Sequence, residues 1–217
     1  MDFEKIRERM VNEQLIPRGI SDPRVLEVFK NVERHKFVAG SLREMAYADH
    51  PLPLDEKQTI SQPYMTALMT EKLALTGSER VLEVGTGSGY QAAILAELAK
   101  EVYTVERFDG LAQSAKKTLE ALGYRNIHVK VGDGTLGWPE HAPFDRIVVT
   151  AGAPRIPQSL IDQLGKNGRM VIPVGGDFSQ ILTLVEKGDH NIMASEICGC
   201  VFVPLVGKEG WKTEDRQ

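Results

Sequence analysis

The sequence predicts an α/β fold: a mostly parallel seven-stranded sheet with a C-terminal antiparallel hairpin and an N-terminal helical extension. Three observations support this prediction. From Val81 onward, short β-branched runs alternate with helical patterns, which is typical of parallel strands joined by helical crossovers. A glycine-rich turn links the first of these strands to the first helix. The last two strand candidates are separated by only five residues, 187–191, which indicates a hairpin.

The composition of the 217-residue chain is that of one globular domain, with 42% hydrophobic and 26% charged residues. A net charge of −4 argues against a nucleic-acid partner. The chain has neither a signal-peptide pattern nor an apolar run of about 20 residues, so no membrane partner is expected. Its histidines are scattered, and no metal site is expected. We expect a cytoplasmic monomer.

The first 75 residues predict a helical extension. An apolar stripe over residues 3–16 indicates an amphipathic helix. A second helix follows Asp22 as its N-cap and begins at Pro23. Residues 47–60 contain prolines and turn formers without a clear period, which predicts an ordered loop. A third helix is expected over residues 62–75.

The strands and helices of the core follow from residue 78 to residue 217, which we treat with the 1–75 extension as a single domain. The strand candidates are residues 81–84, 102–106, 127–131, 146–150, 170–173, 181–186 and 192–203. Helices are expected over residues 90–99, 110–122 and 157–164, with Gly123 and Gly165 as terminators. In such sheets, ligands bind beyond the carboxyl ends of the strands, where the strand order reverses.

The turn after the first core strand supplies the first candidate cofactor-binding residues. These are Glu83, Gly85, Thr86, Gly87 and Gly89. The glycines stand at alternate positions, which differs from the G-x-G-x-x-G spacing of dinucleotide-binding proteins. A carboxylate just before the loop would repel a pyrophosphate, whereas it suits a cofactor that carries positive charge. The pattern therefore disfavours a nicotinamide cofactor.

Two later strand ends supply the remaining cofactor candidates. Glu106 lies 21 positions after Gly85, close to the offset at which an acidic residue reaches a ribose diol. Asp133 and Gly134 belong to a Gly-Asp-Gly turn, where the carboxylate is a candidate acceptor for an adenine amine. The alternatives are a solvated glutamate and an ordinary Asp-Gly turn.

The pattern E-x-G-x-G-x-G at residues 83–89 resembles motif I of the class I S-adenosylmethionine-dependent methyltransferases. This resemblance implies a Rossmann-like fold and S-adenosyl-L-methionine as the cofactor, with S-adenosyl-L-homocysteine as the product. That cofactor carries an ammonium and a sulfonium group but no phosphate.

Further segments lie outside the cofactor motifs, among them Ala46-Tyr47-Ala48-Asp49, Gln58-Thr59-Ile60-Ser61-Gln62-Pro63, Thr150-Ala151-Gly152-Ala153-Pro154 and Phe202-Val203-Pro204-Leu205. They resemble the protein-L-isoaspartate O-methyltransferases, and the likeness runs from about Val11 to Trp211. The segment Gln58–Pro63 is far more specific than the glycine loop, because it is not a general feature of methyltransferases. The resemblance implies methyl transfer to the free carboxylate of isoaspartyl residues, which starts the repair of damaged proteins. Isoaspartyl peptides and damaged proteins are then the expected partners.

The resemblance also implies the substrate site. Ser61 matches the active-site serine of the family, and Thr59 is its neighbour in the substrate cleft. Val203 to Leu205 match backbone that holds the substrate peptide. Residues 55–57, Asp-Glu-Lys, replace glycines that the family often has, which leaves the geometry of that loop open.

Several alternatives remain open from the sequence. Ser61 could simply cap the helix that begins at Gln62. The chain could methylate another carboxylate or a small molecule, be an oxidoreductase, or be a binding module without turnover. The absence of a general base beside Ser61 agrees with carboxyl methylation, because a carboxylate with a pKa of about 4 is already ionised at neutral pH. We therefore expect Ser61 to orient the substrate carboxylate by donating a hydrogen bond.

Overall fold

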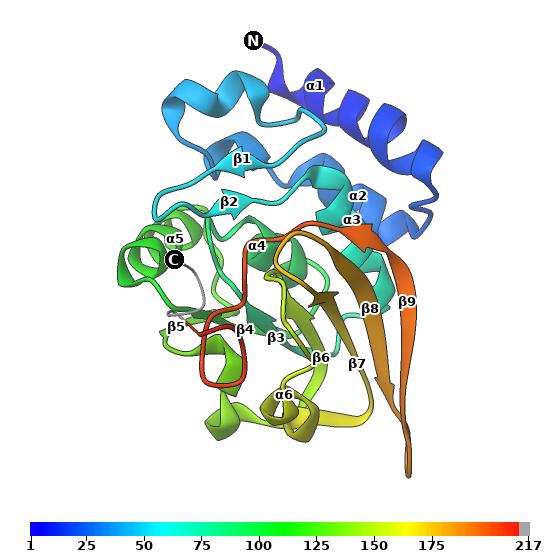
Figure 1. Cartoon of the computed structure of the whole chain (residues 1–217). Helices are drawn as coiled ribbons and strands as arrows, with labels where there is room; N and C mark the ends of the chain where they lie inside the picture. The colour runs from blue at the N-terminus through cyan, green and yellow to red at the C-terminus, as the bar shows by residue number, and fades with distance from the viewer. Residues whose placement is uncertain (213–217) are drawn as a thin grey trace.

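The computed structural model, which describes residues 1–212, is built on a seven-stranded sheet with the order β5-β4-β3-β6-β7-β8-β9 (Figure 1). The strands are β3 (Arg80–Val84), β4 (Glu101–Glu106), β5 (Ile127–Val131), β6 (Phe144–Val149), β7 (Leu164–Gly175), β8 (Gln180–Lys187) and β9 (Ile192–Cys200). Strands β3 to β7 pair in parallel, and β8 and β9 add antiparallel strands. The predicted fold class is confirmed.

Helices join the strands and build the N-terminal extension. The core helices are α4 (Tyr90–Ala96), α5 (Asp109–Ala121) and α6 (Gln158–Gln163), and the extension holds α1 (Phe3–Met10), α2 (Pro23–Asn31) and α3 (Pro63–Leu73). After α1 the chain continues through a π-helical turn and a 3₁₀ turn to Arg18, so the predicted first helix is irregular in its second half. Asp22 caps α2 as predicted, because its side chain accepts from the backbone N of Arg24 at 2.9 Å.

Three predicted boundaries were wrong. Residues 47–60 are not only a loop, because they contain the short hairpin β1 (Leu52–Pro53) and β2 (Thr59–Ile60). Gly165 does not end a helix but lies in β7, which is far longer than predicted. A shift of register between β6 and β7 accommodates the glycine-rich start of β7, which resembles a turn in sequence. Strand β9 ends at Cys200, after which the Phe202 N–H donates to the Gln180 side chain.

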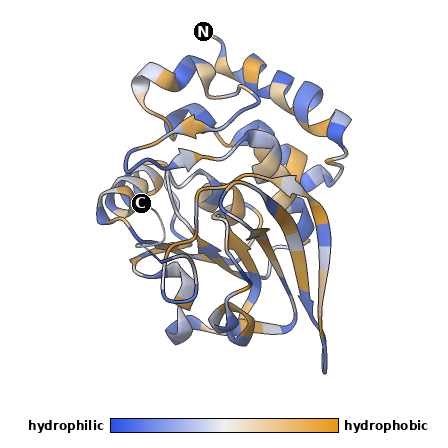
Figure 2. Cartoon of the chain, viewed as in Figure 1, coloured by the Kyte–Doolittle hydropathy of each residue, from blue (hydrophilic) through white to orange (hydrophobic). Residues whose placement is uncertain are grey.

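Buried apolar side chains pack on both faces of the sheet. The strands of the sheet are largely coloured as hydrophobic in Figure 2. Neighbouring residues of β3 alternate between two core clusters: Val81 packs with the extension and α4, and Leu82 packs on the other face against β6. The first cluster includes Phe29 of α2 and Leu73 of α3, so it joins the extension to the sheet. The division of the domain into an extension (residues 1–75) and a core (residues 78–217) stays a prediction, and the first cluster contains residues from both parts.

The extension is positioned to cover the functional end of the sheet. In Figure 1, the hairpin β1–β2 lies above the carboxyl ends of the parallel strands. The segment after β9 returns across the same end, where Gly152 and Pro204 form an isolated parallel bridge. At this end the strand order reverses, because β4 lies on one side of β3 and β6 on the other.

The turn between β1 and β2 adopts a backbone that favours glycine although it contains none. Glu56 and Lys57 both have a φ of 56°, and the Gln58 N–H donates to the Asp55 carbonyl at 3.0 Å. Two successive left-handed residues are typical of a type I′ hairpin turn. The turn adopts this geometry without glycine, so Glu56 and Lys57 are both strained.

We predict that Lys57→Gly stabilises the protein by about 0.5–1 kcal/mol, because glycine removes the Cβ clash at positive φ. Thermal unfolding should show a rise in Tm of about 1–4 °C. Lys57→Ala is the control and should give no comparable gain, since alanine keeps a Cβ. A lower Tm for Lys57→Gly would contradict the strain.

Candidate active site

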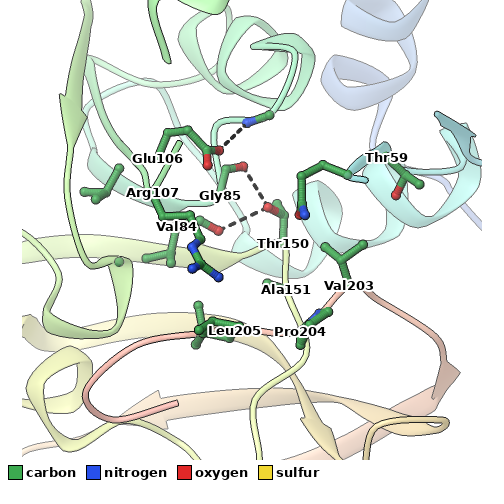
Figure 3. Close-up of a pocket in the computed structure, with 15 residues that line it drawn as sticks. Thr59, Val84, Gly85, Glu106, Arg107, Thr150, Ala151, Val203, Pro204 and Leu205 are labelled. Atoms are coloured by element: carbon green, nitrogen blue, oxygen red, sulfur yellow. Dashed lines mark hydrogen bonds between the residues drawn. The ribbon is translucent and has the colours of Figure 1, made fainter. Parts of the chain in front are cut away.

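Two adjoining cavities lie at the carboxyl ends of β3, β4 and β6. Figure 3 shows the first of them. The first is lined by Gln58, Thr59, Val84, Gly85, Gly87, Val105, Glu106, Arg107, Gly134, Thr150, Ala151, Val203, Pro204, Leu205 and Val206. The second is lined by Thr59, Ile60, Ser61, Thr66, Gly85, Thr86, Gly87, Ser88, Tyr90, Gln91 and Thr150. The extension, the glycine loop and the C-terminal segment therefore meet at one place.

The glycine loop is held between the two neighbours of β3. The Gly85 N–H donates to the carbonyl of Val105 at 2.9 Å, on the β4 side. On the β6 side, a Cβ at Gly85 would lie 2.3 Å from Thr150 Oγ1, so only glycine fits. Gly89 has a φ of 86° and packs against α5, where a Cβ would lie 3.2 Å from Leu119. Gly89 shapes the loop but lines neither cavity.

Thr150 is a site residue for which we predicted no role. Its hydroxyl donates to the carbonyls of Val84 and Gly85, at 3.1 and 2.8 Å, as Figure 3 shows. It follows β6 directly and begins the Thr150–Pro154 segment that carries the family resemblance, and these two features were the available signals. Arg107, which follows β4, and Gln58 also line the first cavity and were not predicted as site residues.

Glu83 lies beneath the loop rather than on a cavity wall. Its side chain is completely buried, and Oε2 accepts from the hydroxyl of Thr104 at 2.6 Å. The hydroxyl of Thr104 lies 2.6 Å from that of Thr86, which lines the second cavity. Oε1 of Glu83 has no partner among the described residues. Burial raises the pKa of Glu83 to about 8, with Thr104 opposing this shift and the Glu106 carboxylate adding to it.

Glu106, at the end of β4, is buried, holds the glycine loop by hydrogen bonds and also borders the first cavity. Its Oε2 accepts from the Gly87 N–H at 2.9 Å, and Oε1 accepts from the Phe108 N–H at 3.1 Å. The side chain lines the first cavity (Figure 3). Each carboxylate oxygen can accept more than one hydrogen bond, so the group can hold the loop and still accept from a ligand.

Within the Gly-Asp-Gly turn, Gly134 lines the first cavity and Asp133 does not. Asp133 Oδ1 accepts from the N–H and hydroxyl of Thr135, and Oδ2 accepts from the Lys208 N–H at 2.7 Å. Asp133 lines neither cavity, so its contact with an adenine amine stays a prediction. Gly134 lines the first cavity, and a Cβ there would lie 2.5 Å from Val84.

Ser61 lines the second cavity, and Thr59 lines both. The Ser61 carbonyl accepts from Arg34 at 2.7 Å, whereas its hydroxyl makes no hydrogen bond within residues 1–212. The N-cap of α3 is Gln62, and no side chain caps this helix. The alternative that Ser61 caps the helix is therefore wrong, and its hydroxyl is available to a ligand.

Val203 to Leu205 form one wall of the first cavity. Part of their backbone is already engaged, because the Val203 carbonyl accepts from the Gly152 N–H at 2.7 Å and the Leu205 N–H donates to the Gly152 carbonyl at 2.8 Å. The Val203 N–H and the Pro204 carbonyl make no hydrogen bond within the described chain. These two backbone groups are therefore free to pair with a ligand.

The residues present fit a cationic nucleoside cofactor. A buried carboxylate oxygen without a partner suits an ammonium group, and a second carboxylate on the cavity wall suits a ribose diol. With the alternate glycines and the sheet order, they define a class I S-adenosylmethionine-dependent methyltransferase. A family model described as protein-L-isoaspartate(D-aspartate) O-methyltransferase matches residues 5–210. The chain belongs to this family.

Individual relatives agree with the family model. Protein-L-isoaspartate O-methyltransferase 1 of Syntrophobacter fumaroxidans is 57% identical over 212 residues, covering 98% of this chain and 99% of the relative. The protein-L-isoaspartate O-methyltransferase of Geobacter metallireducens is 55% identical over 216 residues, covering 99% and 100%.

Solved structures also match. One named protein-L-isoaspartate O-methyltransferase has a TM-score of 0.85 at 30% identity, covering 94% of this chain and 67% of that one. A candidate protein-L-isoaspartate O-methyltransferase from Plasmodium falciparum, solved with S-adenosyl-L-homocysteine, has a TM-score of 0.80 at 27% identity, covering 92% and 98%.

We predict that Glu83→Gln stabilises the ligand-free protein, and that the gain grows with pH. The folded-state pKa of about 8 lies above the ordinary value of 4.5, so wild-type stability falls as the pH rises from 4.5 to 8. Glutamine lacks this loss and should gain on the order of 1–3 kcal/mol at pH 8. Tm measured from pH 5 to 8.5 tests this prediction, with exposed Glu120→Gln as control. Parallel pH profiles for wild type and Glu83→Gln would contradict the prediction.

Proposed function

We propose that this chain transfers the methyl group of S-adenosyl-L-methionine to the free carboxylate of isoaspartyl residues in peptides and damaged proteins, which initiates their repair. Family membership supports the reaction. The main structural support is the position of Ser61. Its hydroxyl has no partner among the described residues, and Ser61 lines the same cavity as the glycine loop. A hydroxyl donor next to a cofactor loop suits a carboxylate acceptor.

We assign cofactor binding to the residues predicted from the sequence. Gly85, Gly87 and Gly134 let the backbone approach the ligand closely, and Glu106 accepts from the ribose. Thr86 and Glu83 form the hydrogen-bonded floor under the ammonium group. Gly89 sets the start of α4. Asp133 shapes the turn that carries Gly134 and is kept as a candidate acceptor for adenine.

The reaction needs orientation more than proton transfer. Bound S-adenosyl-L-methionine supplies an electrophilic methyl group on a sulfonium centre. Ser61 donates a hydrogen bond to one carboxylate oxygen and so aims the other, while Thr59 borders the same space. One C–S bond breaks as one O–C bond forms, and no proton moves, so no general base is required. Alignment of the reacting atoms is the main source of rate.

Recognition of the isoaspartyl link is assigned to backbone contacts. An isoaspartyl residue lengthens the main chain by one methylene group and frees a carboxylate. The Val203 N–H and the Pro204 carbonyl can pair with an extended peptide, as in strand addition. Such pairing reads backbone geometry and is tolerant of flanking side chains.

We further propose that the enzyme acts as a monomer in the cytoplasm and without a nucleic-acid partner. The net charge of −4 supports the last point, and two free cysteines, Cys198 and Cys200, suit a reducing compartment. Within residues 1–212, no helix is both long and apolar enough to cross a membrane.

The proposed substrate predicts selective labelling. With S-adenosyl-L-methionine carrying a labelled methyl group, the enzyme should label an isoaspartyl peptide and leave the matched aspartyl peptide unlabelled. A free isoaspartyl dipeptide and small carboxylates complete the panel. Equal labelling of the two peptides would instead support the alternative of a methyltransferase for other carboxylates.

Ser61→Ala should separate catalysis from stability. Because the hydroxyl makes no hydrogen bond within the described chain, Tm should change by less than about 2 °C. Loss of a hydrogen bond to a charged carboxylate should lower kcat/KM by about tenfold or more. Exposed Ser41→Ala is the control. Full turnover in Ser61→Ala would remove the serine from the proposed site.

A further inference from the structure

Arg34 is a fully buried cation that lies behind the active site rather than in it. It begins a short 3₁₀ turn, Arg34–Lys36, in the extension, and none of its side chain is exposed. Its Nε donates to the Ala46 carbonyl and its Nη2 donates to the Ser61 carbonyl, both at 2.7 Å. Within the described residues, its Nη1 has no partner and no carboxylate neutralises it.

The same guanidinium group also contacts the other half of the site. Its Cζ lies 4.9 Å from the ring centroid of Tyr90, a cation–π contact. Tyr90 is the first residue of α4, directly after Gly89, and lines the second cavity. Arg34 therefore joins the segment that carries Ser61 to the helix that ends the glycine loop.

This arrangement is costly if its only role is to stabilise the fold. Burying a cation without a carboxylate partner is unfavourable, and apolar side chains fill such spaces more cheaply. Burial lowers the pKa of Arg34 to about 10, so the group keeps its charge at neutral pH. An apolar side chain could not make the contacts that Arg34 makes. Its planar guanidinium group donates to two carbonyls and at the same time stacks on the Tyr90 ring.

We propose that Arg34 is a positioning residue that fixes Ser61 relative to the glycine loop and thereby sets the alignment of the substrate carboxylate with the methyl donor. This inference rests on the proposed function. Arg34 acts through the Ser61 carbonyl and not on the substrate itself. A lysine at this position keeps the charge but cannot hold both carbonyls and the ring face at once.

A double-mutant cycle tests this inference. Arg34→Lys should lower kcat for an isoaspartyl peptide by about tenfold or more, because small misplacements of a reacting group cost large factors in rate. In the Ser61→Ala background, the same substitution should lower kcat by less than about twofold, since no hydroxyl remains to be positioned. If Arg34→Lys does not fold, Arg34→Gln, which keeps one amide donor, takes its place in the cycle.

Arg146→Lys is the matched control. Arg146 is partly buried, with 16% of its side chain exposed and Glu79 at 4.0 Å. It donates to the carbonyls of Leu73 and Ala74, at the opposite end of α3 from Ser61. Its loss should lower Tm as the loss of Arg34 does, yet leave kcat unchanged below the unfolding transition. Backbone hydrogen exchange over residues 59–62 should rise in Arg34→Lys and stay at the wild-type level in Arg146→Lys.

The outcomes separate the inference from the function on which it rests. An inactive wild type on isoaspartyl peptides would remove the proposed function, whereas equal losses of kcat in both backgrounds would overturn only the role of Arg34. Unchanged kcat in Arg34→Lys would overturn it as well. Hydrogen exchange needs no substrate, so unchanged exchange over residues 59–62 would refute the inference whatever the reaction is.

Discussion

The close contact between Thr150 and the backbone of Gly85 is the constraint on which the site depends. It fixes the chain where β3 ends, between β4 on one side and β6 on the other. A side chain at Gly85 would collide with the Thr150 hydroxyl, so one of the two would have to move. Because both cavities are lined by these two residues, the position of the loop decides where cofactor and substrate can meet.

The local part of the site could be predicted from the sequence, because it depends on spacing along one segment. Alternate glycines and acidic strand ends are visible without knowing the fold, and Glu106 and Gly134 do line the cavity. Thr150 and Arg34 could not be found in this way. Their roles arise from contacts across more than 25 residues of sequence, which only the tertiary arrangement creates. Strand β7 was too short in the prediction because its first residues resemble a turn. Asn167 has a φ of 57°, and the pairing of β7 with β6 passes from Leu164 directly to Arg169.

Contacts within the extension explain why two of the segments that resemble the family lie far from the cofactor motifs. The Ala46 carbonyl accepts from Arg34, and the Asp49 carboxylate accepts from Gln62, the residue after Ser61, at 2.8 Å. Asp49 also forms an ion pair with Arg18 at 2.7 Å. The Ala46–Asp49 and Gln58–Gln62 segments are thus connected by hydrogen bonds, directly and through Arg34. Ser61 lies where these bonds meet. Residues remote from the cofactor motifs thus hold Ser61 in place, and with it the proposed substrate side of the site.

The buried carboxyl group of Glu83 couples cofactor binding, as proposed, to the number of protons that the protein binds. With a pKa raised to about 8, the group is largely neutral at pH 7 in the free enzyme. In the proposed cofactor assignment, an ammonium group over this floor favours the ionised form, so uptake of the cofactor would release up to one proton to the solvent. The heat of that exchange would include the ionisation enthalpy of the buffer, and calorimetric binding enthalpies are expected to differ between phosphate and Tris.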